Sequence, residues 1–502
     1  MLRSLGGLSA ALALLASLSS CTGTIPTTTV DDAGPDVTVA PLPGCNGQGR
    51  SRCVSSVSVG ARFGCAALGD GTVWCWGRND ESQLGYESSD LCPERLSGGQ
   101  TRAVACHPFP LQVTGLAGAR SVSAGGSHAC AVLGTGELLC WGGNTRGQLG
   151  NASTLPSRSP ALVAGLRGVV AVAAGASHTC AVTDARRVYC WGSNDRGQLG
   201  VESSPHQCGS GSSAAPCARA PVLVPFLSEV VEVVVGDAHT CARSAGGQVY
   251  CWGSNTDGQL GAGTAGESPV PMPQAVRVGA AALRGVVSIA AGGEHTCALR
   301  SDGAVVCWGR HDRGQLGVAV PESFEPCAHA CVRSAVPVVG YEGDGSLDER
   351  DASVDLDASV DDIDASEGDD AGESDGGVDV GVDVGVDNGL PPAPTVVGVS
   401  AGAAFSCISL SDRTVRCWGT NRAYELGSGR MNEGGANLET VIASPGAAAT
   451  NPLQGVQAIE SGSATTCAVL TDRSVRCWGS NEVGALGVGD LSERNGPVSM
   501  TW

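Results

Sequence analysis

The chain of 502 residues is 42% apolar, contains 74 glycines and is 16% charged, with a formal net charge of −20. The apolar fraction is enough for a substantial core, and the glycine content is typical of turn-rich β-structure. Every basic residue is an arginine, and no basic patch with interleaved aromatic residues occurs, so the sequence argues against a nucleic-acid partner.

The first 20 residues predict an export signal. Arg3 precedes an apolar stretch, Leu8–Leu18, that is too short to span a bilayer as a mature helix. Residues 18–21 have the sequence Leu-Ser-Ser-Cys, which resembles the lipobox of bacterial lipoproteins. The resemblance implies a lipid on Cys21 and, because Thr22 follows, an outer-membrane lipoprotein facing the periplasm or the cell surface. An ordinary signal cleaved nearby, with Cys21 unmodified, is the alternative.

Residues 21–44 contain several threonines, aspartates and prolines. Such a segment cannot form a core, so we expect a flexible tether. We expect the folded domain to extend from residue 45 to residue 502.

The rest of the chain is organised around seven copies of Cys-Trp-Gly, each with a second cysteine ten positions upstream. Seven copies of one unit indicate a repeat fold, and small units that bury their faces only against neighbours form solenoids or propellers. The paired cysteines are Cys65 with Cys75, Cys130 with Cys140, Cys180 with Cys190, Cys241 with Cys251, Cys297 with Cys307, Cys407 with Cys417, and Cys467 with Cys477.

The third copy shows the unit clearly. Its runs 169–174, 178–182 and 188–191 are short, apolar and separated by glycine or polar residues, which predicts strands. If Cys180 lies opposite Cys190, their Cα atoms are roughly 4.5–5.5 Å apart, and this distance suits a disulfide. The three-residue hairpin tip then needs one left-handed residue, a place that glycine takes in four copies. With four strands per unit, the sequence predicts an all-β, seven-bladed propeller with a disulfide in each blade.

Eight cysteines remain after the hairpins and Cys21, and they form local couples outside the hairpins. An even number with local partners indicates further disulfides in an oxidising compartment. The couples are Cys45 with Cys53, Cys92 with Cys106, Cys208 with Cys217, and Cys327 with Cys331. A zinc site at the last couple, with His329 between the two cysteines, is the alternative there.

The excess length of the longer copies is expected after the third strand, so that insertions decorate one side of the wheel. The largest insertion is residues 341–394. Between Tyr341 and Leu390 it contains eighteen acidic residues and one arginine, which account for most of the net charge. Its Val-Asp repeats and lack of further aromatic residues predict a disordered linker. Weak Ca²⁺ binding is the alternative, although no stretch there matches the full calcium-loop pattern.

Two further phrases recur around the Cys-Trp-Gly copies. Ala-Gly-x-x-His-x-Cys precedes the hairpin, as at 174–180, and Asn-x-x-Gly-Gln-Leu-Gly follows it, as at 194–200. Together they resemble the repeats of the RCC1 (regulator of chromosome condensation) family, over about residues 54–502 apart from the insertions. The resemblance implies seven blades of four strands, with residues 497–502 as the last strand closing the ring against the first blade. Copies six and seven depart from the Gly-Gln-Leu-Gly pattern, and the cysteines are an addition to it that fits export.

One repeat position carries histidine in four copies and phenylalanine or threonine in the others. The residues are His128, His178, His239 and His295, with Phe63, Phe405 and Thr465. Four histidines could converge on an axis and hold a metal. The phenylalanines favour a packing role, so we predict no metal and no cofactor. The repeated glutamine is expected to bond backbone in its turn.

These features predict a non-enzymatic binding scaffold that holds a protein or glycan at one rim. The predicted contact regions are the disulfide-bearing loops Tyr86–Pro108, Glu202–Pro216 and Pro321–Ser334. The family's founder exchanges guanine nucleotide on a small GTPase, but an exported chain meets no such GTPase. We therefore expect no GTPase partner, and membrane contact through the N-terminal lipid only. The alternatives are an inhibitor of a secreted enzyme, and a hydrolase or lyase with unrepeated ionisable residues at the channel mouth.

Overall fold

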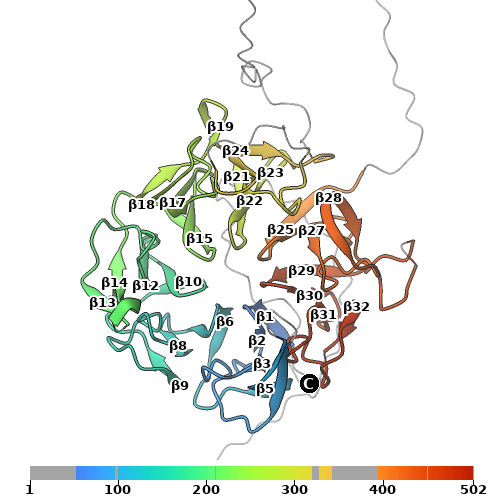
Figure 1. Ribbon diagram of the computed structural model, residues 1–502, viewed down its shortest axis with the longest axis horizontal. Helices are drawn as coiled ribbons and strands as arrows, with labels where there is room; N and C mark the ends of the chain where they lie inside the picture. The colour runs from blue at the N-terminus through green and yellow to red at the C-terminus, as the bar shows by residue number, and fades with distance from the viewer. Residues whose placement is uncertain are drawn as a thin grey trace, which may run out of the picture. The chain divides into compact units, whose positions relative to one another are not determined.

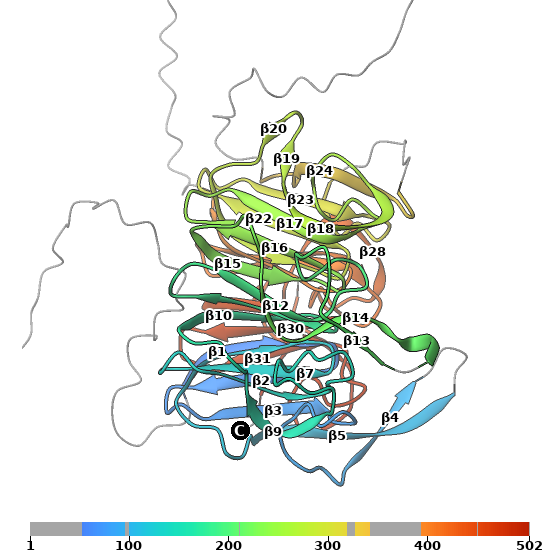
Figure 2. The ribbon, with the colours of Figure 1, turned by 90° about the vertical axis from the view of Figure 1, so that its left-hand side faces the viewer.

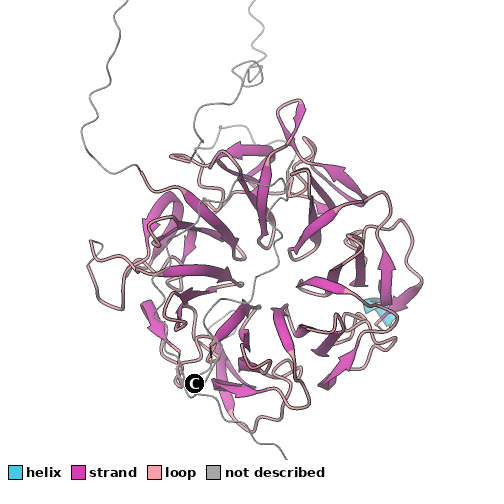
Figure 3. Cartoon of the chain, turned by 180° about the vertical axis from the view of Figure 1, so that it is seen from behind, coloured by secondary structure: helices cyan, strands magenta, loops and turns pink. Residues whose placement is uncertain are grey.

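The computed structural model describes residues 53–95, 100–209, 211–318, 327–341, 393–448 and 450–500. Within them, seven antiparallel sheets follow one another around a central channel (Figure 1), which confirms the all-β, seven-bladed propeller. Figure 3 shows the ring from behind, with one short 3-10 helix, η1 (Gly211–Ser213), on the rim. No helix in these ranges is long and apolar enough to cross a membrane. The predicted signal, Cys21, the tether and nearly all of the acidic insertion lie outside them.

Each blade contributes four strands in chain order from the axis outward, and blades one and three add a fifth at the outer edge. Blade one comprises β1 (Val54–Val59), β2 (Phe63–Leu68), β3 (Val73–Arg78), β5 (Thr101–Gln112) and, at the outer edge, β4 (Leu91–Arg95). Blade two comprises β6 (Ala119–Ala124), β7 (His128–Leu133), β8 (Leu138–Gly142) and β9 (Ser157–Leu162). Blade three comprises β10 (Val169–Ala174), β11 (His178–Thr183), β12 (Val188–Ser193), β14 (Ala215–Leu223) and, at the outer edge, β13 (His206–Cys208). Blades four and five are β15 (Val230–Val235), β16 (His239–Ser244), β17 (Val249–Asn255) and β18 (Gly266–Ala275); and β21 (Val286–Ala291), β22 (His295–Arg300), β23 (Val305–Arg310) and β24 (Cys331–Pro337), with the small hairpin β19 (Arg277–Val278) and β20 (Ala281–Ala282) between them. Blades six and seven are β25 (Val396–Ala401), β26 (Phe405–Leu410), β27 (Val415–Asn421) and β28 (Asn432–Thr440); and β29 (Val456–Ser461), β30 (Thr465–Leu470), β31 (Val475–Gly479) and β32 (Arg494–Ser499).

The alternation of strand direction gives the wheel two different faces. The loop face carries the turns between first and second strands and the loops that follow each Cys-Trp-Gly. The tip face carries the hairpin tips between second and third strands and the connections from one blade to the next. In Figure 2 the strands run across the wheel, and the β4–β5 and β13–η1 extensions project from the loop face.

The central hairpin has the predicted register in every blade. Cys180 lies directly opposite Cys190, and the other six pairs are placed in the same way. All seven pairs are buried disulfides, as the ten-residue spacing predicts. Their Cα–Cα distances of 4.0–4.1 Å are shorter than the roughly 4.5–5.5 Å expected for opposed strand residues. In chain order the bonds join Cys65 to Cys75, Cys130 to Cys140, Cys180 to Cys190, Cys241 to Cys251, Cys297 to Cys307, Cys407 to Cys417, and Cys467 to Cys477.

The hairpin tips also follow the prediction. One tip residue has a positive φ in every blade, and glycine takes this place in four of the seven. The residues are Gly71, Gly136, Arg186, Gly247, Gly303, Arg413 and Arg473. Three blades therefore accept a left-handed arginine where the turn itself would favour glycine.

Each blade packs against the next through the tryptophan of its Cys-Trp-Gly, which is fully buried in all seven copies. The indole N–H donates to a backbone carbonyl in the Gly-Gln-Leu-Gly turn of the preceding blade, as from Trp191 to Gln148 at 2.9 Å. The seven bonds measure 2.8–3.0 Å, and the one from Trp76 to Ala485 joins blade seven to blade one. One side chain therefore supplies both the apolar contact and the hydrogen bond between neighbours.

The last strand, β32, pairs with β31 inside blade seven, and Met500 directly after it shares a buried cluster with Trp76, so the end of the chain closes the ring against the first blade as expected. One expectation about the chain path was wrong. The acidic insertion follows a fourth strand and not a third: it joins the described chain after Tyr341 and before Ala393, between β24 and β25. It is therefore attached to the tip face, like the β19–β20 hairpin and opposite the β4 and β13 extensions.

Candidate functional site

Seven glycine turns surround the channel mouth on the loop face, and each touches the same turn of the next blade. A Cβ added to Gly60 would lie 2.3 Å from the carbonyl oxygen of Gly125. The equivalent distances around the ring are 2.3–2.9 Å and close from Gly462 back to Gly60. Backbone bonds follow the same path, as from Ser463 N to Gly60 O at 3.2 Å. The ring therefore tolerates only glycine, and this fixes the width of the mouth.

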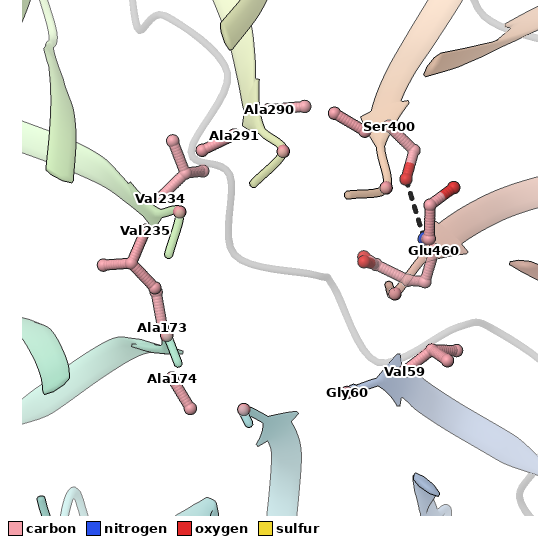
Figure 4. Close-up of a pocket in the computed structure, with 18 of the residues that line it drawn as sticks. Val59, Gly60, Ala173, Ala174, Val234, Val235, Ala290, Ala291, Ser400 and Glu460 are labelled. Carbon is pink, nitrogen blue, oxygen red and sulfur yellow. Dashed lines mark hydrogen bonds between the residues drawn. The ribbon is translucent and has the colours of Figure 1, made fainter. Parts of the chain in front are cut away.

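The mouth opens into a cavity of about 420 Å³ lined by the ends of the seven innermost strands (Figure 4). Most lining residues are glycine, alanine, serine or valine. Apart from Ile289, the exceptions are three carboxylic acids, Glu232, Asp237 and Glu460, at positions where the other blades carry uncharged residues. None of these three residues was predicted as a site residue, although each departs from the repeat at its position.

Glu460 replaces a serine that joins neighbouring blades elsewhere. Ser58, Ser123 and Ser400 stand at the same position in blades one, two and six. Each serine hydroxyl accepts a backbone N–H from the next blade, and the bond from Ser461 to Ser400 is 2.8 Å long. Figure 4 shows that Glu460 instead extends into the channel.

The channel changes the acidity of its carboxyl groups. Glu460 is reached by water, but protein surrounds it on every side of the channel. This desolvation, with the nearby charge of Glu232, raises the pKa of Glu460 to about 7. Desolvation and the charge of Glu294 raise the pKa of Asp237. Desolvation also raises the pKa of Glu232, although Arg243 Nε donates to it at 2.7 Å. Glu460 can thus exchange a proton near neutral pH.

The four histidines do not converge on the axis, because each bonds the next blade. His128 Nε2 lies 2.8 Å from the hydroxyl of Thr179, and the other three make the same contact at 2.9–3.0 Å. The Thr179 hydroxyl donates to Gln148 O at 2.8 Å, so the imidazole must be the donor in the first bond. Among the described residues, Nδ1 has no hydrogen-bond partner in any of the four rings. Burial lowers the pKa of His128 to about 4 and of the others to about 3. They are neutral residues that hold blades together.

The repeated glutamines bond backbone as predicted. Gln148 Oε1 accepts the N–H of Arg146 at 2.9 Å, and the glutamines of blades one, three, four and five do the same. Their role is therefore to shape the turn whose carbonyl receives the tryptophan.

Two of the predicted contact loops form stapled extensions of the loop face. β4 pairs with β5 and is joined to it by the disulfide between Cys92 and Cys106. β13 pairs with β14 and is joined to it by the disulfide between Cys208 and Cys217. Residues 321–326 of the third loop lie outside the described residues, as does Cys45. Because Cys53 is unpaired within them, the coupling of Cys45 with Cys53 stays a prediction.

Glu94 fixes the first extension over the wheel. Its buried carboxylate accepts hydrogen bonds from the side chains of Arg62, Arg78 (2.8 Å) and Arg102. Desolvation acts to raise the pKa of Glu94, but Arg102 and the charges of Arg78 and Arg62 hold it below its ordinary value. This ionic cluster borders a second cavity of about 280 Å³ next to the channel mouth.

The zinc alternative does not fit the third couple. Cys327 and Cys331 are joined as a disulfide. His329 is directed to the buried carboxylate of Asp257 in blade four, at 3.0 Å. The residues of this loop are thus used in a contact between blades four and five.

The comparison with known proteins decides the family. The RCC1-like domain matches residues 22–348, and the Regulator of chromosome condensation (RCC1) repeat matches residues 396–424 and 456–485. The chain belongs to the RCC1-like family. This confirms the resemblance seen in the repeats. The two matches to the RCC1 repeat lie in blades six and seven of this RCC1-like propeller, and each includes the Cys-Trp-Gly of its blade.

Relatives of this RCC1-like chain have varied names. It is 38% identical to mouse Regulator of chromosome condensation over 117 residues, which are 23% of this chain and 27% of the mouse protein. It is 31% identical to the human Probable E3 ubiquitin-protein ligase HERC6 over 274 residues, which are 54% of this chain and 20% of the ligase. The match thus spans only about a quarter of the length of the mouse protein and a fifth of the length of the human ligase.

Solved structures share the fold. Human WBSCR16 aligns with a TM-score of 0.61 and 21% identity, covering 86% of this chain and 94% of that one. Prp20p of Saccharomyces cerevisiae, described with its binding to Gsp1p and histones, aligns with a TM-score of 0.55 and 19% identity, covering 90% and 87%. At these identities the likeness concerns the fold alone.

Proposed function

We propose that this RCC1-like propeller is exported, anchored by a lipid on Cys21, and uses its loop face to bind a protein or glycan at the cell envelope. The ten disulfides of the described residues support an oxidising compartment. The lipobox-like Leu-Ser-Ser-Cys at 18–21 supports the anchor. The proposal includes no small GTPase.

The observation that carries the binding role is the pair of stapled extensions on the loop face. β4 and β13 lengthen blades one and three on the loop face, and among the described residues no other blade has a fifth strand. A disulfide at the base of each extension limits its freedom in the unbound state, which lowers the entropy lost on binding. The yeast relative Prp20p binds the proteins Gsp1p and histones, so the family scaffold is compatible with protein partners.

Cross-linking in envelope fractions tests this role. In one variant, residues 201–217 are replaced by the short blade-two segment 151–156, which removes Cys208, Cys217 and the β13 extension together. A tip-face variant outside the proposed contacts, Val339→Ser, serves as the control. We expect a cross-linked partner with the native chain and the control, and its loss with the shortened loop. An unchanged partner with the shortened loop would contradict the assignment, and a secreted enzyme as the partner would favour the inhibitor role.

The acidic channel mouth supports a second candidate, a propeller hydrolase or lyase. Unrepeated ionisable residues at one mouth are the feature that this alternative requires, and Glu232, Asp237 and Glu460 provide it. A carboxyl group with a pKa of about 7 is suited to general acid–base catalysis. Screening glycan and peptide substrates with native chain and Glu460→Gln tests this candidate. Turnover that the variant loses would establish it.

A further inference from the structure

Three non-glycine residues in left-handed conformations meet on the tip face around blade three. Arg186 at the hairpin tip has φ 56°, and Phe226 and Glu229 in the next connection have φ 63° and 55°. The turns of blades one, two and five have Gly115, Gly165 and Gly340 at the place of Phe226, also with positive φ. Non-glycine residues pay a conformational cost in this region, and such costs concentrate at functional sites.

Phe226 has no packing role that explains the cost. Its side chain is 88% exposed. A Cβ added to Gly115, Gly165 or Gly340 would meet nothing within 4 Å, so this turn position points away from the wheel in the other blades as well. Glycine would serve the turn better, and the aromatic side chain is therefore explained by something outside the chain.

The neighbours of Phe226 form one continuous surface. Backbone bonds join the blade-three tip to the connections on both sides, from Asp184 N to Gly168 O at 2.7 Å and from Val230 N to Arg186 O at 3.1 Å. Further bonds, from Ala245 N to Glu229 O and from Val286 N to Gly247 O, extend the surface to blade five. We call this surface the basic sector, and it comprises residues 164–168, 184–187, 225–229, 245–247 and 277–285.

The basic sector is positively charged in an acidic chain. It contains five arginines and two acidic residues, a net charge of +3. Arg186 pairs with Glu229 at 3.5 Å, whereas Arg167, Arg187 and Arg284 are exposed and form no ion pair within the described ranges. The β19–β20 hairpin adds exposed alanines at 280–282 and projects from the rim in Figure 1.

We propose that the basic sector binds the surface of an anionic phospholipid bilayer, with Phe226 inserted among the headgroups and the unpaired arginines contacting lipid phosphates. Aromatic side chains flanked by arginine are suited to this interface. The inference deepens the proposed function, because β1 begins on the tip face and a lipid tether would join the propeller there. Tethering raises the effective concentration of the bilayer, so a weak contact is sufficient. It replaces the expectation that the N-terminal lipid alone contacts the membrane.

The chain's own acidic insertion is the competing occupant, because it joins the tip face after Tyr341. The basic sector would attract the carboxylates of the insertion, and the bound insertion would then cover the sector in the full-length protein. The test must therefore include a chain without residues 342–392.

Vesicle flotation with the chain beginning at residue 22, which lacks both the apolar export signal and the lipid site at Cys21, tests the contact. We expect binding to phosphatidylglycerol-containing vesicles at low salt, no binding to phosphatidylcholine vesicles, and about tenfold weaker binding for Phe226→Gly. Phe226→Gly restores the residue of the sister turns and should fold. Leu155→Ser, which removes an exposed loop-face side chain, is the matched control and should bind like its parent.

Three outcomes would overturn the inference: no vesicle binding, equal binding by Phe226→Gly, or binding only after deletion of residues 342–392. A dimer that Phe226→Gly dissociates would also overturn it in favour of self-association. None of these results bears on the loop-face partner, which the cross-linking experiment tests, or on the lipid, which intact mass tests.

Discussion

The interfaces between blades and the wall of the channel use the repeat in opposite ways. Between blades, the same contacts recur, such as Trp191 to Gln148 and His128 to Thr179. At the channel mouth, the ionisable residues Glu232 and Glu460 each occur once. The difference shows that the repeated residues hold the wheel together. Residues that depart from the repeat, such as Glu232 and Glu460, indicate the positions that serve a role other than stability.

Removing an inter-blade tryptophan should have the largest effect. Trp191→Ala removes a fully buried indole and its bond to Gln148 O, and we expect a loss of about 3–5 kcal/mol in the free energy of unfolding. Trp74→Ala, at a half-buried tryptophan of blade one, should cost clearly less. Equilibrium denaturation measures both variants. Equal losses in the free energy of unfolding would show that the repeated tryptophan contributes no more to stability than Trp74 does.

A smaller loss is expected from the glycine ring. The Cβ of Gly60→Ala would lie 2.3 Å from Gly125 O, so two blades must separate, at a cost of about 1–3 kcal/mol. Gly435→Ala is the control, because its Cβ would meet nothing within 4 Å. Thermal unfolding compares the two, and a Gly60→Ala protein as stable as the control would contradict a close-packed mouth.

Acid should weaken the inter-blade contacts through the buried histidines. Their pKa values of about 3 to 4 lie below the unfolded value of about 6.5, so the unfolded chain binds protons first as the pH falls. The contribution of the histidines to the free energy of unfolding is complete above pH 6.5 and is lost as the pH falls toward 4. At pH 5 the loss reaches up to about 2 kcal/mol per histidine. Denaturation at pH 7 and pH 5 should show this, and His178→Phe, with the residue type of blades one and six, should lose less. An equal free energy at both pH values would refute the assignment.

The smallest effect, of opposite sign, is expected at the channel. The pKa of Glu460 is raised to about 7, so its contribution to stability is present at low pH and is lost as the pH rises through 7. Glu460→Ser, which installs the serine of blades one, two and six, should raise the melting temperature at pH 8 more than at pH 6. A uniform shift at both pH values would indicate that the carboxyl group does not titrate in this range.

The elements that follow the local repeat could be predicted from the sequence. The ten-residue spacing placed Cys180 opposite Cys190 because hairpin register is determined within one short segment. The bond from Trp191 to Gln148 was missed, since it joins residues 43 positions apart in different blades. Glu460 could have been found by aligning it with Ser58, but its position in the channel depends on ring closure. The side taken by the acidic insertion was mistaken because spacing between copies does not show which strand precedes the added residues.

The most direct test of the account is a disulfide and lipid map of the protein recovered from cell envelopes, obtained by mass spectrometry without reduction. We predict that each of the seven hairpins is joined across its ten-residue spacing, as Cys180 is to Cys190, and that Cys21 carries acyl chains. Free thiols at the hairpin positions, or an unmodified Cys21, would contradict an exported, anchored propeller.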